Sequence, residues 1–127
     1  MDLYNKKLFI FDLDGTLVDT APDFKNSLNY MLNEINEEPI QLDEIRNLVG
    51  YGARELIRRT VLSKGIEHDD KKINDMLKTF LLHYTHNIDD DSVLFDNVEN
   101  VLLFLKEKNI KLAVCTNKME KLSNLLL

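Results

Sequence analysis

Two carboxylates, a glycine and a hydroxyl follow directly on a short apolar run near the start of the chain. Asp12 and Asp14 stand two residues apart, and Gly15 and Thr16 come next. A carboxylate is ionised at neutral pH because its unperturbed pKa is about 4, so it can attack without a neighbouring base. The second carboxylate can carry a proton, and the pair can share one cation. The spacing therefore points to a site for nucleophilic and acid/base chemistry.

The apolar run 8–11 predicts where this site lies. A short continuous apolar run is typical of a strand buried on both faces of a parallel sheet. Ligands of such sheets bind at the carboxyl ends of the strands. Gly15 supplies the permissive backbone of a tight turn, whose N–H groups can approach an anion. An ordinary Asp-rich turn after a strand is the alternative interpretation.

The residues 12–19, Asp-Leu-Asp-Gly-Thr-Leu-Val-Asp, resemble the first motif of the haloacid dehalogenase (HAD) superfamily of phosphatases. The resemblance implies that Asp12 is the nucleophile, that Asp14 is the general acid/base, and that both belong to a Mg²⁺ site. Gly15 and Thr16 are then expected to contact phosphate. The implied reaction is hydrolysis of a small phosphate monoester through an aspartyl-phosphate. A phosphomutase or a phosphonate hydrolase would share Asp12.

A second apolar strand is expected at 111–116, where the chain continues as Thr116-Asn117-Lys118. Thr116 matches the second HAD motif, so its hydroxyl and the N–H of Asn117 are expected to bind phosphoryl oxygens. The segment of helix and strand that ends in Thr-Asn-Lys is similar to that of phosphoglycolate phosphatases, although residues 96–97 are Asp-Asn where that subgroup often has Pro-Gly. Lys118 belongs to this segment, and the role of the family's third-motif lysine is not assigned to it.

Four helices are expected between the two strands, because apolar side chains recur there every three or four residues. The first begins at Thr20 and ends before Glu37, and the others occupy 43–49, 53–63 and the segment from Asp69 to 88. An all-helical block in this position resembles the mobile cap of one HAD subgroup, which closes over the site and selects the substrate. An ordinary helical subdomain is the alternative.

One arginine of the third helix is a candidate for binding a substrate carboxylate. Arg54 and Arg59 follow a glycine-bearing loop that resembles the cap loop of phosphoglycolate phosphatases. The planar guanidinium pairs well with a carboxylate. The alternative is that both are solvated residues of the helix surface.

The predicted fold class is therefore α/β, with the N-terminal part of a Rossmann-like parallel sheet and an inserted all-helical cap. Residues 1–19 are expected to form the first strand and the catalytic loop, 20–91 the cap, and 92–127 a helix at 97–108 and the second strand. The lysine of the third motif and the acidic fourth motif belong beyond residue 127 in the family. The chain is therefore expected to be truncated, and an inactive fragment that acts as a binding or pairing module is the alternative function.

Composition limits the partners and the compartment. The net charge of −6 argues against non-specific nucleic-acid binding, which needs a basic surface. Residues 1–7 lack the apolar region of a signal peptide, and no stretch approaches the ~18 apolar residues of a membrane span, so a cytoplasmic protein is expected. The single cysteine, Cys115, is predicted to be a small buried side chain, and His83 and His86 to be surface residues.

Overall fold

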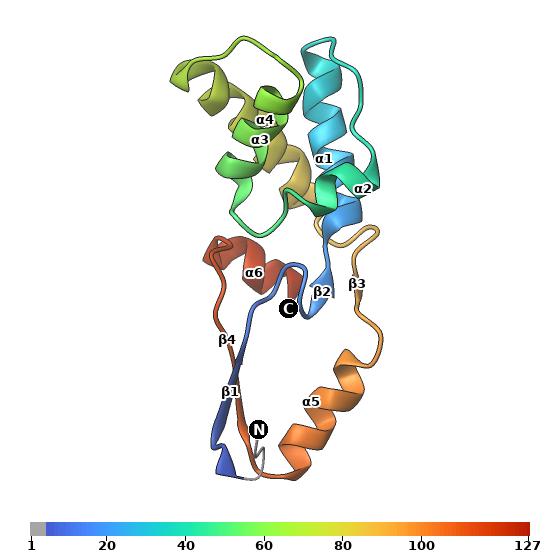
Figure 1. Cartoon of the computed structure of the whole chain (residues 1–127), viewed down its shortest axis with the longest axis vertical. Helices are drawn as coiled ribbons and strands as arrows, with labels where there is room; N and C mark the ends of the chain where they lie inside the picture. The colour runs from blue at the N-terminus through green and yellow to red at the C-terminus, as the bar shows by residue number, and fades with distance from the viewer. Residues whose placement is uncertain (1–4) are drawn as a thin grey trace.

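The computed structural model describes residues 5–127. Residues 1–4, part of the segment that lacks a signal peptide's apolar region, lie outside the described residues. The molecule is elongated, with a bundle of helices at one end and a pair of strands with one helix at the other (Figure 1). No helix within residues 5–127 is both long enough and apolar enough to cross a membrane.

A parallel pair of strands confirms the predicted α/β fold. Strand β1 (Leu8–Phe11) pairs with β4 (Lys111–Val114), and Leu8 lies opposite Lys111. The ladder extends one residue further, because the N–H of Cys115 donates to the carbonyl of Phe11 at 2.8 Å. Parallel pairing brings the carboxyl ends of both strands to one edge, so the segments after residues 11 and 114 lie side by side.

A second, short strand pair connects this sheet to the helices. Strand β2 (Val18–Asp19) runs antiparallel to β3 (Val93–Leu94). The N–H of Phe95 also donates to the carbonyl of Leu17 at 3.2 Å. The chain therefore leaves for the helices and returns from them through two hydrogen-bonded strands that lie next to each other (Figure 1).

The helices α1–α4 form a block with a closed apolar core. Their bounds are α1 (Ala21–Glu34), α2 (Leu42–Arg46), α3 (Ala53–Ser63) and α4 (Asp70–His86). Asp69 caps α4 by accepting a hydrogen bond from the N–H of Lys72 at 2.8 Å, as its position before the apolar pattern predicts. The core side chains that are no more than 1% exposed are Leu28, Met31, Leu32, Ile45, Ile57, Val61, Phe80 and Tyr84.

Two further helices flank β4. Helix α5 (Val98–Glu107) precedes the strand and α6 (Glu120–Leu126) follows it. Asn97 at the start of α5 has a φ of 66°, a left-handed conformation that Asn tolerates better than most residues other than glycine. Leu122 of α6 is 5% exposed and joins the core of the helical block.

The predicted burial of both strands is wrong. In β1, Leu8 is 48% and Ile10 61% exposed, and in β4 Leu112 is 38% and Val114 40% exposed. The strand pattern was that of a sheet covered on both faces, but within residues 5–127 the sheet has only two strands. Cys115 is likewise exposed instead of buried, because it continues the same uncovered strand.

Two other side-chain expectations also need correction. Val101, which the apolar pattern of the helix expected at 97–108 predicts to face inward, is 48% exposed. His83, expected at the surface, is half-buried, because its ring stacks on Tyr30 at 4.5 Å and its Nδ1 lies 2.9 Å from the hydroxyl of Ser27. His86 is exposed as expected and contacts the carbonyl of Leu82.

An ion pair joins α2 to β2, the strand that leads into the helical block. Both guanidinium nitrogens of Arg46 donate to the carboxylate of Asp19, each at 2.8 Å (Arg46 is 42% and Asp19 17% exposed). These hydrogen bonds hold the pKa of Asp19 below its ordinary value of 3.8. The folded state therefore binds fewer protons at Asp19 than the unfolded state, so the stabilisation is present above pH 3.8 and is lost as the pH falls through the lowered pKa.

Arg46→Gln is expected to lower the free energy of unfolding at neutral pH by about 0.5–1 kcal/mol, since the pair is partly exposed. The difference from wild type shrinks toward zero as the pH falls well below 3.8. Urea denaturation at several pH values measures it. Arg46→Lys is the control, because it keeps the charge but cannot donate to the carboxylate from two nitrogens. Its free energy of unfolding should lie between those of wild type and Arg46→Gln. A difference that is the same at every pH would contradict this account.

Candidate active site

The loop after β1 is a tight turn organised by one carbonyl. The carbonyl of Leu13 accepts hydrogen bonds from the N–H groups of Thr16, Leu17 and Val18 at 3.0–3.2 Å. Leu13 itself is fully buried and anchors the turn. Gly15 has a φ of 77°, a left-handed conformation that favours glycine, which explains why the two carboxylates are followed by this residue.

The two carboxylates of this turn differ in their surroundings. Asp12 is exposed at the end of β1, and its Oδ1 accepts a hydrogen bond from the N–H of Leu13 at 2.8 Å. Asp14 is only 9% exposed, and its Oδ1 lies 2.9 Å from the Nζ of Lys118. Asp12 is thus accessible to a substrate or a cation, whereas Asp14 is held by a charged partner.

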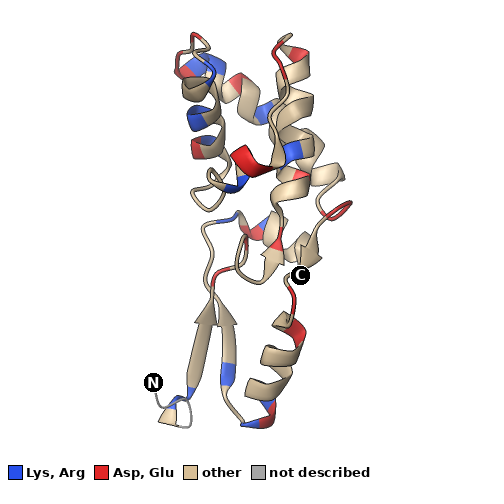
Figure 2. Ribbon diagram, turned by 45° about the vertical axis from the view of Figure 1, so that its right-hand side comes forward, with Lys and Arg blue, Asp and Glu red and all other residues tan. Residues whose placement is uncertain are grey.

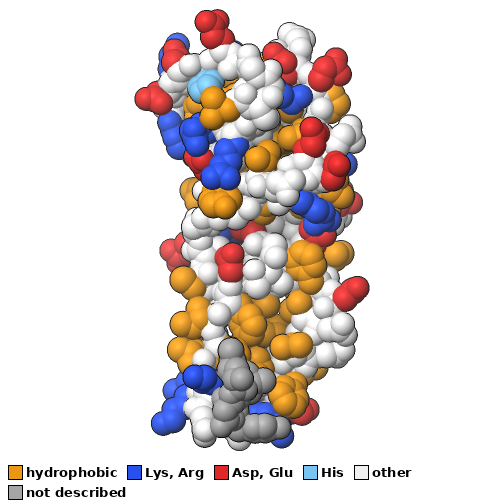
Figure 3. Space-filling view, in the orientation of Figure 1, with side chains coloured by type: hydrophobic (Ala, Val, Ile, Leu, Met, Phe, Trp, Pro, Cys, Tyr) orange, Lys and Arg blue, Asp and Glu red, His pale blue; other side chains and the backbone are white. Residues whose placement is uncertain are grey.

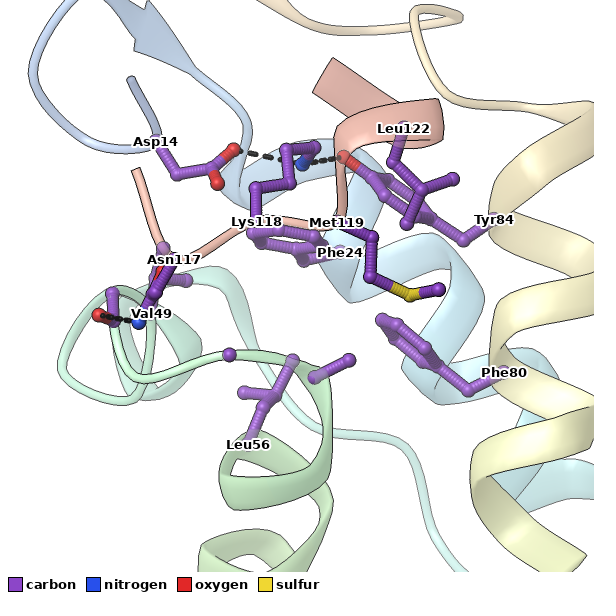
Figure 4. Close-up of a pocket in the computed structure, with 13 residues that line it drawn as sticks. Asp14, Phe24, Val49, Leu56, Phe80, Tyr84, Asn117, Lys118, Met119 and Leu122 are labelled. Atoms are coloured by element: carbon purple, nitrogen blue, oxygen red, sulfur yellow. Dashed lines mark hydrogen bonds and ion pairs between the residues drawn. The ribbon is translucent and has the colours of Figure 1, made fainter. Parts of the chain in front are cut away.

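Lys118 connects the strand end to the helical block. Its side chain is 4% exposed, and its Nζ donates to Asp14 and, at 2.6 Å, to the hydroxyl of Tyr84 on α4. The same Nζ lies 4.7 Å from the ring centres of both Phe24 and Tyr84 (Figure 4). The ammonium group therefore has one anion, one phenol and two aromatic faces around it.

Burial shifts both titrating partners away from their charged forms. It lowers the pKa of Lys118, although the neighbouring Asp14 opposes this shift. Burial also raises the pKa of Tyr84, and the negative charges of Asp14 and Asp23 add to that effect. Tyr84 therefore stays a neutral phenol that accepts a hydrogen bond from Lys118.

The end of the second strand lies at the same edge. The hydroxyl of Thr116 accepts a hydrogen bond from the N–H of Lys118 at 3.1 Å, which fixes the turn that carries the lysine. Asn117 is exposed and its side-chain amide donates to the carbonyl of Gly50 at 3.0 Å. The predicted phosphate contact Asn117 therefore touches the loop before α3 through its side chain.

A cavity lies between the strand ends and the helical block (Figure 4). Among residues 5–127, Asp14 and Lys118 are the only charged residues that line it, and the remaining wall is mostly apolar, with Phe24, Val49, Ala53, Leu56, Phe80, Met119 and Leu122. Gly50 and Gly52, from the loop before α3, complete it. Four segments that are distant in the sequence thus meet beside Asp14.

The two arginines predicted to bind a carboxylate lie elsewhere. Arg54 pairs with Asp70 at 3.7 Å and donates to Asn74, both on α4. Arg59 donates to Glu55 at 2.8 Å, and its guanidinium stacks on the ring of Tyr51 at 3.9 Å. Neither lines the cavity, so their role in substrate binding stays a prediction.

Sequence reasoning did not identify Lys118, Tyr84 and Phe24 as members of this site. Tyr84 and Phe24 follow the helical apolar pattern, which predicts only that they are core residues. Their sequence separation from Lys118 leaves no local spacing signal. A tyrosine among the otherwise nonpolar core positions of α4 is the available hint, because its buried hydroxyl needs a partner.

The carboxylates fit a magnesium site only in part. Mg²⁺ is commonly held by one or two carboxylates together with water and substrate phosphate, and exposed Asp12 suits that arrangement. Asp14 is occupied by Lys118. Over residues 5–127, no three Asp, Glu, His or Cys side chains gather at one point that could hold a metal.

The buried Asp14–Lys118 pair should be strongly coupled in stability. Asp14→Asn and Lys118→Met are each expected to lower the free energy of unfolding by about 3 kcal/mol, because each leaves a buried charge without its partner. The double variant should cost less than the sum of the two, with a coupling energy of about 0.5–3 kcal/mol. Urea denaturation of all four proteins measures this cycle. Strictly additive effects would show that the pair is not a unit.

A family model described as haloacid dehalogenase-like hydrolase matches residues 9–127. The chain is 41% identical over 121 residues to a phosphoglycolate phosphatase of Colwellia psychrerythraea, covering 93% of this chain and 54% of that protein. It is 42% identical over 123 residues to that of Caulobacter vibrioides, covering 97% and 52%. The chain thus spans about half the length of the curated relatives it matches.

Solved structures agree with this assignment. A crystal structure of a predicted phosphoglycolate phosphatase from Haemophilus somnus superposes with a TM-score of 0.81 at 32% identity, covering 91% of this chain and 53% of that one. A predicted phosphatase from Clostridium acetobutylicum shares the fold, with a TM-score of 0.80 at 23% identity, covering 96% and 54%. The sequence match over residues 9–127 and the shared fold show that the chain belongs to the haloacid dehalogenase-like hydrolase family.

Proposed function

We propose that this chain carries the nucleophile and the acid/base of a Mg²⁺-dependent phosphatase that acts on a small, phosphoglycolate-like phosphate monoester. The observation that carries the proposal is the difference between the two carboxylates: Asp12 is exposed at the strand end, and Asp14 is buried beside a cavity. Relatives named phosphoglycolate phosphatase at about 40% identity support the substrate class.

In the proposed reaction, a carboxylate oxygen of Asp12 attacks phosphorus in line with the bond to the leaving oxygen. That bond breaks and an aspartyl-phosphate forms. Asp14, which must first leave its ion pair with Lys118 and take up a proton from water, donates that proton to the departing alkoxide. Asp14 then takes a proton from water, whose oxygen attacks the phosphorus and releases inorganic phosphate and free Asp12. A bound Mg²⁺ would offset the charge of an anionic nucleophile that meets an anionic phosphate.

The turn and the second strand end are proposed to hold the phosphoryl oxygens. Gly15 and Thr16 are exposed on the turn, but their N–H groups donate to the carbonyls of Val18 and Leu13 and would have to leave them to reach a phosphoryl oxygen. The hydroxyl of Thr116 and the N–H of Asn117 belong to the neighbouring strand end. Fixed N–H and O–H donors at such positions stabilise charge that shifts between oxygens during transfer.

The helical block, with the hydrogen-bonded β2 and β3 as its connections, is proposed to act as the cap. It supplies the apolar wall of the cavity and the aromatic cage around Lys118. Such a cavity suits a small leaving group. Binding of a substrate carboxylate by Arg54 or Arg59 would require these side chains to leave Asn74 and Glu55.

The alternative, an inactive binding or pairing module, is favoured by two observations. Within residues 5–127, no cluster of three metal ligands exists. The parallel strands are also exposed, which is unusual for such a sheet. Turnover by the isolated chain distinguishes the two hypotheses.

We expect the purified chain to hydrolyse p-nitrophenyl phosphate and phosphoglycolate with Mg²⁺ and to lose this activity with EDTA. Asp12→Asn should reduce kcat by more than about 1,000-fold, because the nucleophile is lost. The matched control is Asp43→Asn, an exposed carboxylate in the first turn of α2, which should leave turnover unchanged. A folded wild-type chain without turnover would overturn the proposal for this chain and favour the binding module.

A further inference from the structure

The strand half of the molecule exposes apolar side chains on both of its parallel strands and on the helix before β4. We call this surface the open sheet. Its residues are the exposed apolar side chains of β1, β4 and α5, namely Leu8, Ile10, Val101, Leu103, Phe104, Leu112 and Val114, each 38–61% exposed. Figure 3 shows hydrophobic side chains gathered over this half of the molecule.

The open sheet spans both faces of the strand pair. In the parallel register, Leu8 and Ile10 lie opposite Lys111 and Ala113, whereas Leu112 and Val114 lie opposite the two phenylalanines of the other face. Lys111, the first residue of β4, is the charged residue of the two strands, and the rest of both strands is uncharged (Figure 2). Helix α5 covers part of one face, since Val98 and Leu102 pack near Phe11.

Parallel strands are stable when helices cover both faces and further strands pair with the edges. Here the outer edges of β1 and β4 pair with no other strand within residues 5–127. The contrast with the helical block is sharp, because that block buries its core side chains to 9% exposure or less. The helical block exposes apolar side chains too, such as Leu62 and Leu82, but no residue of β1 or β4 is buried, so this part of the fold lacks the further chain that would cover it.

The relatives indicate what that additional chain is. The chain matches 52–54% of the length of its two relatives named above and 53% of the H. somnus structure, so nearly half of each of those proteins has no counterpart here. We propose that the open sheet binds, in trans, a polypeptide equivalent to that unmatched half, which adds strands to the free edges and covers the apolar side chains. This inference is independent of the proposed function, since it concerns binding only.

The probe is the unmatched half of the C. vibrioides or the C. psychrerythraea phosphoglycolate phosphatase, expressed as a separate polypeptide. The positive control is its capture by the matching half of the same protein, and the probe used is the one that passes this control. Co-expression with the affinity-tagged chain, followed by light scattering on a sizing column, should show a one-to-one complex. Hydrogen exchange should show new protection of the amides of β1 and β4.

Two matched variants locate the binding surface. Ile10→Lys places a charge at a position that is 61% exposed, so the chain itself can tolerate it, and it should weaken binding by about tenfold or more. Leu82→Lys makes the same change at a position of α4 that is 67% exposed, outside the open sheet, and should leave binding unchanged.

Three results would overturn the inference. The first is failure to capture a probe that passed its positive control. The second is binding that Ile10→Lys and Leu82→Lys affect equally. The third is a homodimer that Ile10→Lys abolishes and Leu82→Lys preserves, which would assign the open sheet to a second copy of the chain. A complex without phosphatase activity would support the inference while it contradicts the proposed function.

Discussion

The buried ion pair of Asp14 and Lys118 is the interaction on which the two halves of the molecule depend. Asp14 comes from the turn after β1 and Lys118 from the turn after β4, so the pair joins the ends of both parallel strands. The same ammonium group contacts Tyr84 and Phe24 of the helical block. Removing two charges from water is costly, and here the cost is offset because the cation is surrounded by an anion, a hydroxyl and two aromatic faces.

The two halves satisfy the requirements of a folded domain to different degrees. Helices α1, α3 and α4 bury one another's apolar faces, and Leu122 of α6 closes the core from the strand side. The strands have backbone pairing with each other but lack the layers that would remove Ile10 or Val114 from water. Local stability is therefore expected to be highest in the helical block and lowest at the strand edges.

The parts of the fold that were predictable are those encoded locally. The helices follow from apolar periodicity, and the carboxylates at a strand end follow from an apolar run with Asp12 and Asp14 behind it. Burial was not predictable for Cys115 and β4, because the apolar pattern of a strand records the environment of a complete sheet. The ion pair was not predictable either, since 104 residues separate its partners. The direct contact of Lys118 with Asp14, and not with Asp12, depends on the turn at Thr116, which no spacing rule encodes.

The position of Lys118 also ties the state of Asp14 to the position of the helical block. The aromatic cage belongs to α1 and α4, whereas the lysine and the carboxylate belong to the strand ends. A rigid movement of the block on β2 and β3 would withdraw Tyr84 and Phe24 and admit water to the ion pair. Hydration would remove the main cause of the lowered pKa of Lys118 and weaken its attraction to Asp14. The carboxylate of Asp14 would then be open to water, so a movement of the block would change the surroundings of the group that the proposed reaction uses twice.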